Sequence, residues 1–324
     1  MNLPHYNDVL QRPFKEAGFN VVYEFAALQP PYSPGMWPLR FPEVIWTNNT
    51  VVIMHCQDFV SIVNGTCPEL LAIEKHFGNR ASQVVIVHWT IDLQSVYTGP
   101  MNLLYFPAHS YGLLNNLAQT QEEWRPKLLT KRPTNWQCLN GTTRAHRRKV
   151  AYYMKEHYQN GILSFGEEIP LPEWDFSTYI GCENETNWQR LQPVYSSCNV
   201  NIVTETQYYE TPGIVTEKTL MAFLGLQIPV FIGYRGMIDH IEGLGFDVFR
   251  DLVDTSYDYW DDDVRWQDAI DLNADIINGN FDRSKYLERM LRNQEYALNA
   301  WPEMLVEQFN SNVLSILGNL RQSF

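Results

Sequence analysis

The sequence contains no run of about 18 apolar residues, which is the length that a membrane-crossing helix needs. The stretch before residue 20 also lacks the apolar core of a secretory signal peptide. We therefore expect a cytoplasmic protein, of a bacterium or of a virus-infected host cell, without a transmembrane segment.

Positive charge is scarce. The chain has 24 Lys and Arg against 37 Asp and Glu, for a net charge of −13. Because phosphate neutralisation dominates affinity for nucleic acid, this balance argues against a protein whose main partner is DNA or RNA.

Cysteine pairs are also lacking. The five cysteines are an odd number, they are widely spaced, and they include neither a CxxC motif nor a histidine pair at zinc spacing. We expect free thiols in a reducing compartment, and neither a disulfide framework nor a zinc site.

What is present is the composition of a folded protein, with 45% hydrophobic and 19% charged residues over 324 positions. This length suits two α/β domains of about 150 residues each. We place an N-terminal domain at residues 1–130, a second domain at 131–300 and a C-terminal helix at 301–324.

The first half alternates apolar strands with helical stretches, which favours a parallel sheet covered by helices. The expected strands are Asn20–Phe25, Val51–His55, Gln83–Trp89 and Asn102–Phe106, with a helix over Pro68–Phe77. Ligands of such sheets bind beyond the carboxyl ends of the strands. The polar residues at those ends are Asp58, His88, Asp92 and His109.

A strongly basic helix start follows an expected strand at Trp136–Leu139. Five basic or potentially basic residues crowd this start: Arg144, His146, Arg147, Arg148 and Lys149. Cations at the positive end of a helix dipole are unfavourable unless an anion binds there. The alternative is a solvated helix start whose charges pair with acidic neighbours.

Residues 199–236 predict one βαβ unit, with a strand through Val200–Val203, a helix over Thr216–Leu226 and a strand over Ile228–Ile232. Thr216 is a suitable N-cap, and Glu217 complements the helix dipole. Lys218 opposes the dipole, and an anion such as phosphate would explain its position. Alternatively, Glu217 and Lys218 are ordinary surface charges.

Two further expectations concern the C-terminal third. Gly243–Phe249 has the pattern of a short strand, and residues 283–322 predict two helices that break at Pro302. The acidic triplet Asp261–Asp263 precedes a helical pattern, so the helix dipole accounts for it and we expect no metal there.

The central segments Glu205–Gln207, Val215–Lys218 and Ile228–Gly233 resemble the donor-binding signature of family 10 glycosyltransferases, the α1,3/α1,4-fucosyltransferases. The family usually has Asn where this chain has Thr206, and its loop is shorter. The resemblance therefore points to a divergent branch of the family.

The resemblance implies an α/β fold of GT-B type, with two Rossmann-like domains facing a cleft. It also implies a transferase that moves a sugar, with fucose from GDP-fucose as the favoured case, from a nucleoside-diphosphate sugar to a glycan or another hydroxyl acceptor. No metal or further cofactor is expected. Lys218 and Arg147 would stabilise the leaving diphosphate, and Glu217 would bind the ribose. The expected donor-binding residues are Arg144, Arg147, Glu205, Tyr208, Tyr209, Thr216, Glu217 and Lys218.

The reaction also needs a base for the acceptor hydroxyl, from the N-terminal domain. The family uses a glutamate after a strand, and Asp92 occupies the most comparable place in this chain. His88 and Asp58 are rivals.

Two other function classes stay open. A phage-type glycosyltransferase that modifies DNA would need a basic stripe on the N-terminal domain, and few Lys or Arg lie between residues 41 and 123. A non-catalytic protein that binds sugar nucleotides or glycans would have lost the base, and only turnover separates it from an enzyme.

Overall fold

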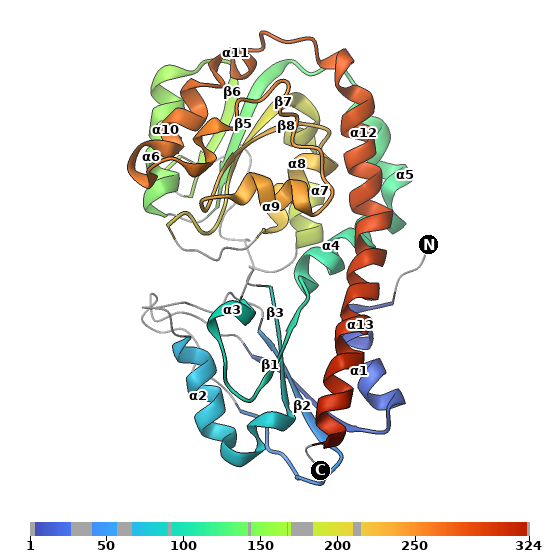
Figure 1. The fold of residues 1–324 in the computed structure, drawn as a ribbon. Coiled ribbons are helices and arrows are strands. Elements are labelled where there is room, and N and C mark those ends of the chain that lie inside the picture. Colours follow the sequence, from blue (N-terminus) through green and yellow to red (C-terminus); the bar gives the residue numbers. More distant parts are fainter. Residues whose placement is uncertain are drawn as a thin grey trace. The chain divides into compact units, whose positions relative to one another are not determined.

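The computed structural model describes residues 4–26, 41–56, 67–89, 93–141, 144–166, 168–169, 184–209 and 215–322. The chain divides into two compact units, Met1–Gly112 with Trp301–Phe324, and Leu113–Ala300. Each unit contains one four-stranded parallel sheet, so the fold is mixed α/β (Figure 1). Residues 301–324, expected as a separate helix, belong to the first unit, and the expected boundary at residue 131 lies within the second.

The sheet of the first unit has the strand order β1-β2-β3-β4, which follows the sequence. The strands and α-helices of this unit are α1 (Tyr6–Glu16), β1 (Asn20–Ala26), β2 (Thr50–Cys56), α2 (Pro68–Phe77), β3 (Val84–His88), α3 (Leu93–Val96), β4 (Asn102–Tyr105) and α13 (Trp301–Gln322). Helix α4 (Ala108–Gln119) continues from this unit into the second.

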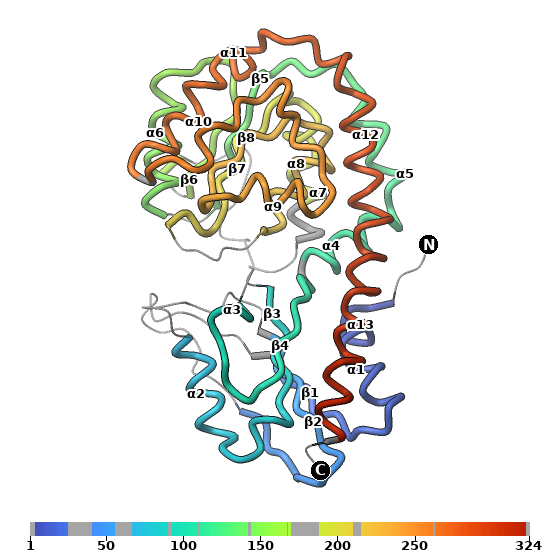
Figure 2. The backbone as a smooth tube through the Cα atoms, in the orientation of Figure 1, coloured from blue at the N-terminus to red at the C-terminus, as the bar shows by residue number. Residues whose placement is uncertain are grey.

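Helices cover the first sheet because its strands are apolar on both faces. Val52, Met54 and Ile86 belong to one buried cluster with Leu70 and Ile73 of α2. Helices α1 and α13, from opposite ends of the chain, contact each other, and they also contact β1 and β4, respectively (Figure 2). When right-handed connections between parallel strands all run in the same direction across a sheet, their helices lie on one face of that sheet.

The sheet of the second unit has the order β6-β5-β7-β8. Its elements are α5 (Gln121–Trp124), β5 (Thr134–Asn140), α6 (Ala145–His157), β6 (Gly161–Phe165), α7 (Asn184–Ser197), β7 (Cys198–Thr204), α8 (Glu217–Leu224), β8 (Ile228–Ile232), α9 (Met237–Gly243), α10 (Asp262–Asp271), α11 (Ala274–Ile277) and α12 (Leu287–Glu295).

The winding of this second sheet reverses at its centre. From β5 the chain passes through α6 to β6 on one side, whereas from β7 it passes through α8 to β8 on the other. Strands β5 and β7 are neighbours. The connection that leaves the carboxyl end of β5 and the one that leaves the carboxyl end of β7 therefore lead away from each other. Open α/β sheets bind their ligands at such switch points.

Most expected elements are confirmed, including the helix Pro68–Phe77 and the strand Ile228–Ile232. The expected strand over Gly243–Phe249 is wrong. Its backbone turns, with positive φ at Gly245 and Phe249. The N–H of Asp247 donates to the Asn293 side chain at 2.9 Å, so α12 takes the hydrogen bond that a strand would use.

The expected helix break at Pro302 is also wrong. Helix α12 runs through a π-helix, Tyr296–Ala300, directly into α13, and Pro302 is the second residue of α13. Proline has no N–H and its ring clashes with the carbonyl four residues earlier. The wider π turn just before Pro302 accommodates this mismatch without ending the helix.

Arg132 joins several elements of the second unit through their backbone. Its side chain is buried and donates to the carbonyls of Leu128 (3.1 Å), Tyr195 (2.9 Å), Gly225 (2.7 Å) and Cys198. The Leu128 carbonyl lies in the 3-10 turn just before Arg132, and the other three lie at the ends of α7 and α8 and at the start of β7. Burial lowers the pKa of the guanidinium to about 9, so the carbonyl dipoles hold the cation at a desolvation cost.

We predict that Arg132→Met destabilises the protein by about 3 kcal/mol, because it leaves buried carbonyls without a donor. Urea unfolding measures the change. The matched control is Lys131→Met, which removes the same charge from the exposed neighbouring position and should change the free energy of unfolding by less than about 0.5 kcal/mol. Equal losses from both variants would contradict the role of Arg132.

Candidate functional site

The carboxyl ends of β5 and β7 meet at the switch point. Asn140 ends β5 and Thr204 ends β7, and the Thr204 hydroxyl donates to the Asn140 side-chain oxygen. Both residues are buried. This hydrogen bond joins the two strands where their connections diverge.

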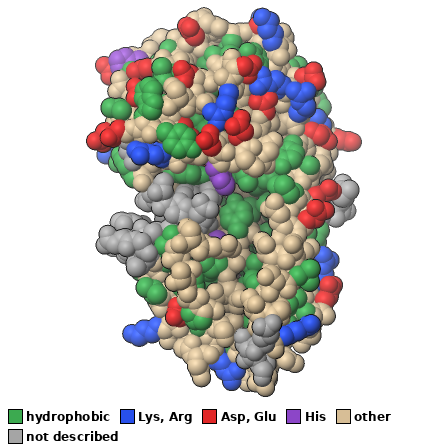
Figure 3. Space-filling view, in the orientation of Figure 1, with side chains coloured by type: hydrophobic (Ala, Val, Ile, Leu, Met, Phe, Trp, Pro, Cys, Tyr) green, Lys and Arg blue, Asp and Glu red, His purple; other side chains and the backbone are tan. Residues whose placement is uncertain are grey.

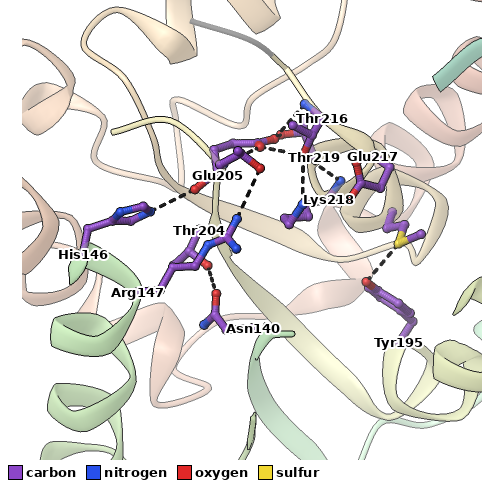
Figure 4. Close-up of polar contacts among 12 residues, drawn as sticks. Asn140, His146, Arg147, Tyr195, Thr204, Glu205, Thr216, Glu217, Lys218 and Thr219 are labelled. Carbon is purple, nitrogen blue, oxygen red and sulfur yellow. Dashed lines mark hydrogen bonds and ion pairs between the residues drawn. The ribbon is translucent and has the colours of Figure 1, made fainter. Parts of the chain in front are cut away.

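Glu205 follows β7 directly and is completely buried. Figure 4 shows its carboxylate at the start of α8. Oε1 accepts from the N–H of Thr216 at 3.0 Å and from the hydroxyl of Thr219 at 2.7 Å. Oε2 accepts from the hydroxyl of Thr216 at 2.6 Å and from the N–H of Thr206 at 3.1 Å. Each oxygen therefore accepts one backbone N–H and one hydroxyl.

The backbone of Glu205 makes further connections. Its N–H donates to Ile232 of β8 at 2.8 Å, and its carbonyl accepts from Nε2 of His146 in α6 at 2.9 Å. A Cβ at Gly233 would lie 2.2 Å from the Met237 sulfur and 3.2 Å from Cβ of Glu205, so any side chain there would have to displace Met237 and press on Glu205. One residue thus joins β7, β8, α6 and α8.

Thr216, Glu217 and Lys218 form the start of α8. The Thr216 hydroxyl accepts from the Lys218 N–H at 3.4 Å, as expected of an N-cap. Nζ of Lys218 lies 2.7 Å from Oε1 of Glu217, and the two side chains are 27% and 20% exposed. The ion pair explains how the first turn accommodates a cation. An external anion is therefore not required for helix stability, although both side chains reach solvent.

The two arginines at the start of α6 have different environments. Arg144 is the exposed N-cap residue, whereas Arg147 is 1% exposed and its Nη2 donates to the Thr206 hydroxyl at 3.4 Å. Burial and the charge of Arg144 lower the pKa of Arg147 to about 10, and Glu205 and Glu217 oppose that change. Arg144 is therefore better placed than Arg147 to contact a ligand.

Tyr208 packs inside the protein. Its ring is stacked on the His146 imidazole, with centroids 5.1 Å apart and planes 11° apart, and the Arg265 guanidinium lies 4.5 Å from its centroid. The Tyr208 ring is therefore occupied by protein groups. Tyr209, by contrast, is 49% exposed and meets Tyr208 edge-on.

The candidates for a base are only partly described. Asp58 and Asp92 lie outside the described residues, as does the side chain of His109, which falls within α4. His88 ends β3, is 1% exposed and faces the Tyr105 ring edge-on. A side chain buried to this degree is not accessible to a ligand hydroxyl.

Asp261 is the N-cap of α10, and its side chain accepts from the Asp263 N–H at 3.1 Å. Over the described ranges, no three His, Cys, Asp or Glu side chains are grouped as metal ligands. None of the helices in this part of the chain combines the length and apolar character that crossing a bilayer requires.

Two residues of this region, Thr219 and Arg265, were missed from the sequence. Thr219 is three residues from Thr216, which places both hydroxyls on one side of a helix start and could have indicated a shared acceptor. Arg265 carried no such signal, because it reaches Tyr208 from a distant part of the chain.

Comparisons with protein-family models, with curated proteins and with solved structures found no match for the chain. What the second unit does is therefore inferred from its own residues.

We predict an acid-dependent loss of stability from His146. Burial, followed by the charge of Arg147, lowers its pKa to about 4. Its contribution is present above the unfolded pKa of 6.5 and is lost as the pH falls toward 4. His146→Gln keeps an N–H donor but does not titrate. The free energy of unfolding of the wild type should fall, relative to this variant, by about 3 kcal/mol between pH 7 and pH 4. A pH-independent difference would contradict this.

For Asp258, we predict that the free energy of unfolding changes with pH in the opposite direction. Its carboxylate accepts from the N–H of Ile238 at the start of α9, at 3.0 Å, and burial raises its pKa to about 6. Its contribution is fully present below the unfolded pKa of 3.8 and is lost as the pH rises through 6. Urea unfolding of Asp258→Asn should therefore show a gain over the wild type that grows by about 2 kcal/mol between pH 4 and pH 7.

Proposed function

We propose that the protein is a glycosyltransferase of GT-B type whose second unit binds a nucleoside-diphosphate sugar. The observation that carries the proposal is the switch point between β5 and β7, since crevices at such points hold the ligands of open α/β sheets. The resemblance of the central segments to the family 10 signature supports the same donor class, with a GDP-linked sugar as the favoured case.

The charges near this switch point suit a diphosphate. Helices α6 and α8 follow β5 and β7, so the positive ends of both helix dipoles lie at the same edge of the sheet. Arg144 is exposed at the first of these ends, and Lys218 is partly exposed at the second. In a chain with a net charge of −13, two cations at helix starts on the same edge of the sheet favour the binding of an anion there.

In the proposed reaction, the oxygen of an acceptor hydroxyl bonds to the anomeric carbon of the sugar. The bond from that carbon to the diphosphate breaks, and its electron pair leaves with the diphosphate. Lys218 and Arg144 stabilise the charge that develops there, and the buried Arg147 adds to the positive potential. Glu217 accepts hydrogen bonds from the ribose, and Tyr209 packs on the base or the sugar.

The hydroxyl proton passes to a base outside the donor site. Asp92 is the proposed base on the sequence resemblance, and Asp58 is the alternative. The acceptor is a glycan or another molecule with a free hydroxyl.

The visible face of the second unit does not favour a nucleic-acid acceptor. On the face drawn in Figure 3, basic and acidic side chains are intermingled over the second unit. A nucleic-acid groove instead collects Lys and Arg along one stripe.

We predict that calorimetry detects tight binding of one of GDP, UDP, ADP and CMP, and of the matching sugar nucleotide. Lys218→Ala should weaken this binding at least about tenfold, because it removes a cation from the diphosphate. The matched control is Lys155→Ala, which removes the same charge from the exposed last turn of α6 and should leave the affinity within about twofold.

Release of the free nucleoside diphosphate from the bound sugar nucleotide then reports turnover. If no nucleotide binds the wild type, the proposed function is wrong. If Lys155→Ala weakens binding as much as Lys218→Ala, the ligand is attracted by general charge and not held at the switch point.

A further inference from the structure

We infer that Glu205 is a positioning residue, which acts on the donor through Thr216 and Lys218 and does not touch the donor itself. This inference rests on the proposed function, and it replaces the expectation from the sequence that Glu205 contacts the donor sugar.

The first step is the occupancy of the carboxylate. Glu205 is 0% exposed, and its two oxygens already accept four hydrogen bonds from Thr206, Thr216 and Thr219. A sugar hydroxyl could bind this carboxylate only if it displaced one of these donors. Two of the four donors are backbone N–H groups, which would then be buried without an acceptor at a substantial cost.

The second step is the direction of the Thr216 hydroxyl. A hydroxyl has one proton, and Thr216 gives it to Glu205 at 2.6 Å. Its lone pairs are then turned toward Lys218, whose backbone N–H and Nζ both lie 3.4 Å from this oxygen. The carboxylate thus fixes the hydroxyl, and the hydroxyl helps to fix the ammonium between itself and Glu217.

The third step is the link to the other side of the switch point. The backbone carbonyl of Glu205 accepts from His146, the second residue of α6. Arg144 and Arg147 lie within two residues of His146, so the residue that orders the start of α8 through its side chain also contacts the start of α6 through its backbone. Glu205→Gln keeps this backbone contact, so its effect on the donor is expected through Thr216 and Lys218.

A double-mutant cycle on nucleotide affinity tests this inference. Glu205→Gln keeps the size of the side chain, but its NH₂ group faces a backbone N–H that can only donate. In the wild-type background, the variant should weaken binding of the nucleoside diphosphate about tenfold. In the Lys218→Ala background, it should weaken the residual binding by less than about twofold, because the residue through which it acts is gone.

The cycle separates the possible outcomes. Equal losses in both backgrounds would show that Glu205 touches the ligand or supports the whole fold, and would overturn the inference. An unchanged affinity in Glu205→Gln would also overturn it, while leaving the proposed function intact. Failure of the wild type to bind any nucleotide would instead refute the proposed function.

Thr219 gives a milder variant in case Glu205→Gln does not fold. Thr219 is 1% exposed and contacts Glu205 through its hydroxyl. Thr219→Val removes that hydroxyl at nearly constant volume and should weaken binding about threefold, whereas Thr219→Ser keeps it and should restore the affinity. If Thr219→Ser binds as weakly as Thr219→Val, side-chain shape and not the hydrogen bond is responsible, which contradicts the inference.

Asp258→Asn is the matched control for changing a buried carboxylate to an amide at a helix start. Asp258 accepts from the first turn of α9, the next helix along the chain. The control should leave nucleotide affinity unchanged within about twofold. A tenfold loss in the control would mean that any damaged helix start in this unit weakens binding, and would overturn the specific role of Glu205.

Discussion

The second unit depends on one buried carboxylate. Desolvating such a charge costs several kcal/mol, and it is tolerated only where hydrogen bonds satisfy the group completely. Glu205 meets that condition with four donors and with the positive end of the α8 dipole beside it. Two neighbouring residues are matched to Glu205. Gly233 carries no side chain that would press on Glu205 and Met237. His146 donates to the Glu205 carbonyl, and burial and the charge of Arg147 lower its pKa so that it is neutral near pH 7.

The two sheets have the same number of parallel strands but different topological roles. In the first, the connections all step in one direction, and the carboxyl ends of the strands form a continuous edge. In the second, the reversal between β5 and β7 separates the loops that follow them, and polar residues such as Asn140 and Glu205 lie there. The chemistry proposed for the protein belongs to the sheet whose winding reverses.

The sequence was sufficient for elements whose pattern is local. Apolar runs predicted the strands, and the helix over Pro68–Phe77 was predicted with its observed bounds. The local pattern gave a wrong prediction for Gly243–Phe249. The backbone turns there, because the Asn293 side chain of α12 takes up a backbone hydrogen bond that a strand would use. The sequence identified Glu205 as important but could not say what its carboxylate contacts. The strand order of the second sheet, like the packing of Arg265 against Tyr208, depends on contacts between distant segments, which no local pattern encodes.

The stabilisation that Arg132 provides depends on salt and acid differently from that of an ordinary ion pair. A cation paired with carboxylates weakens when acid protonates its partners or when salt screens them. The partners of Arg132 are backbone carbonyls, which do not titrate, and they lie in the interior, where mobile ions do not enter. The junction of α7, β7 and α8 is therefore insensitive to ionic strength and to acid, even though the chain as a whole carries a net charge of −13.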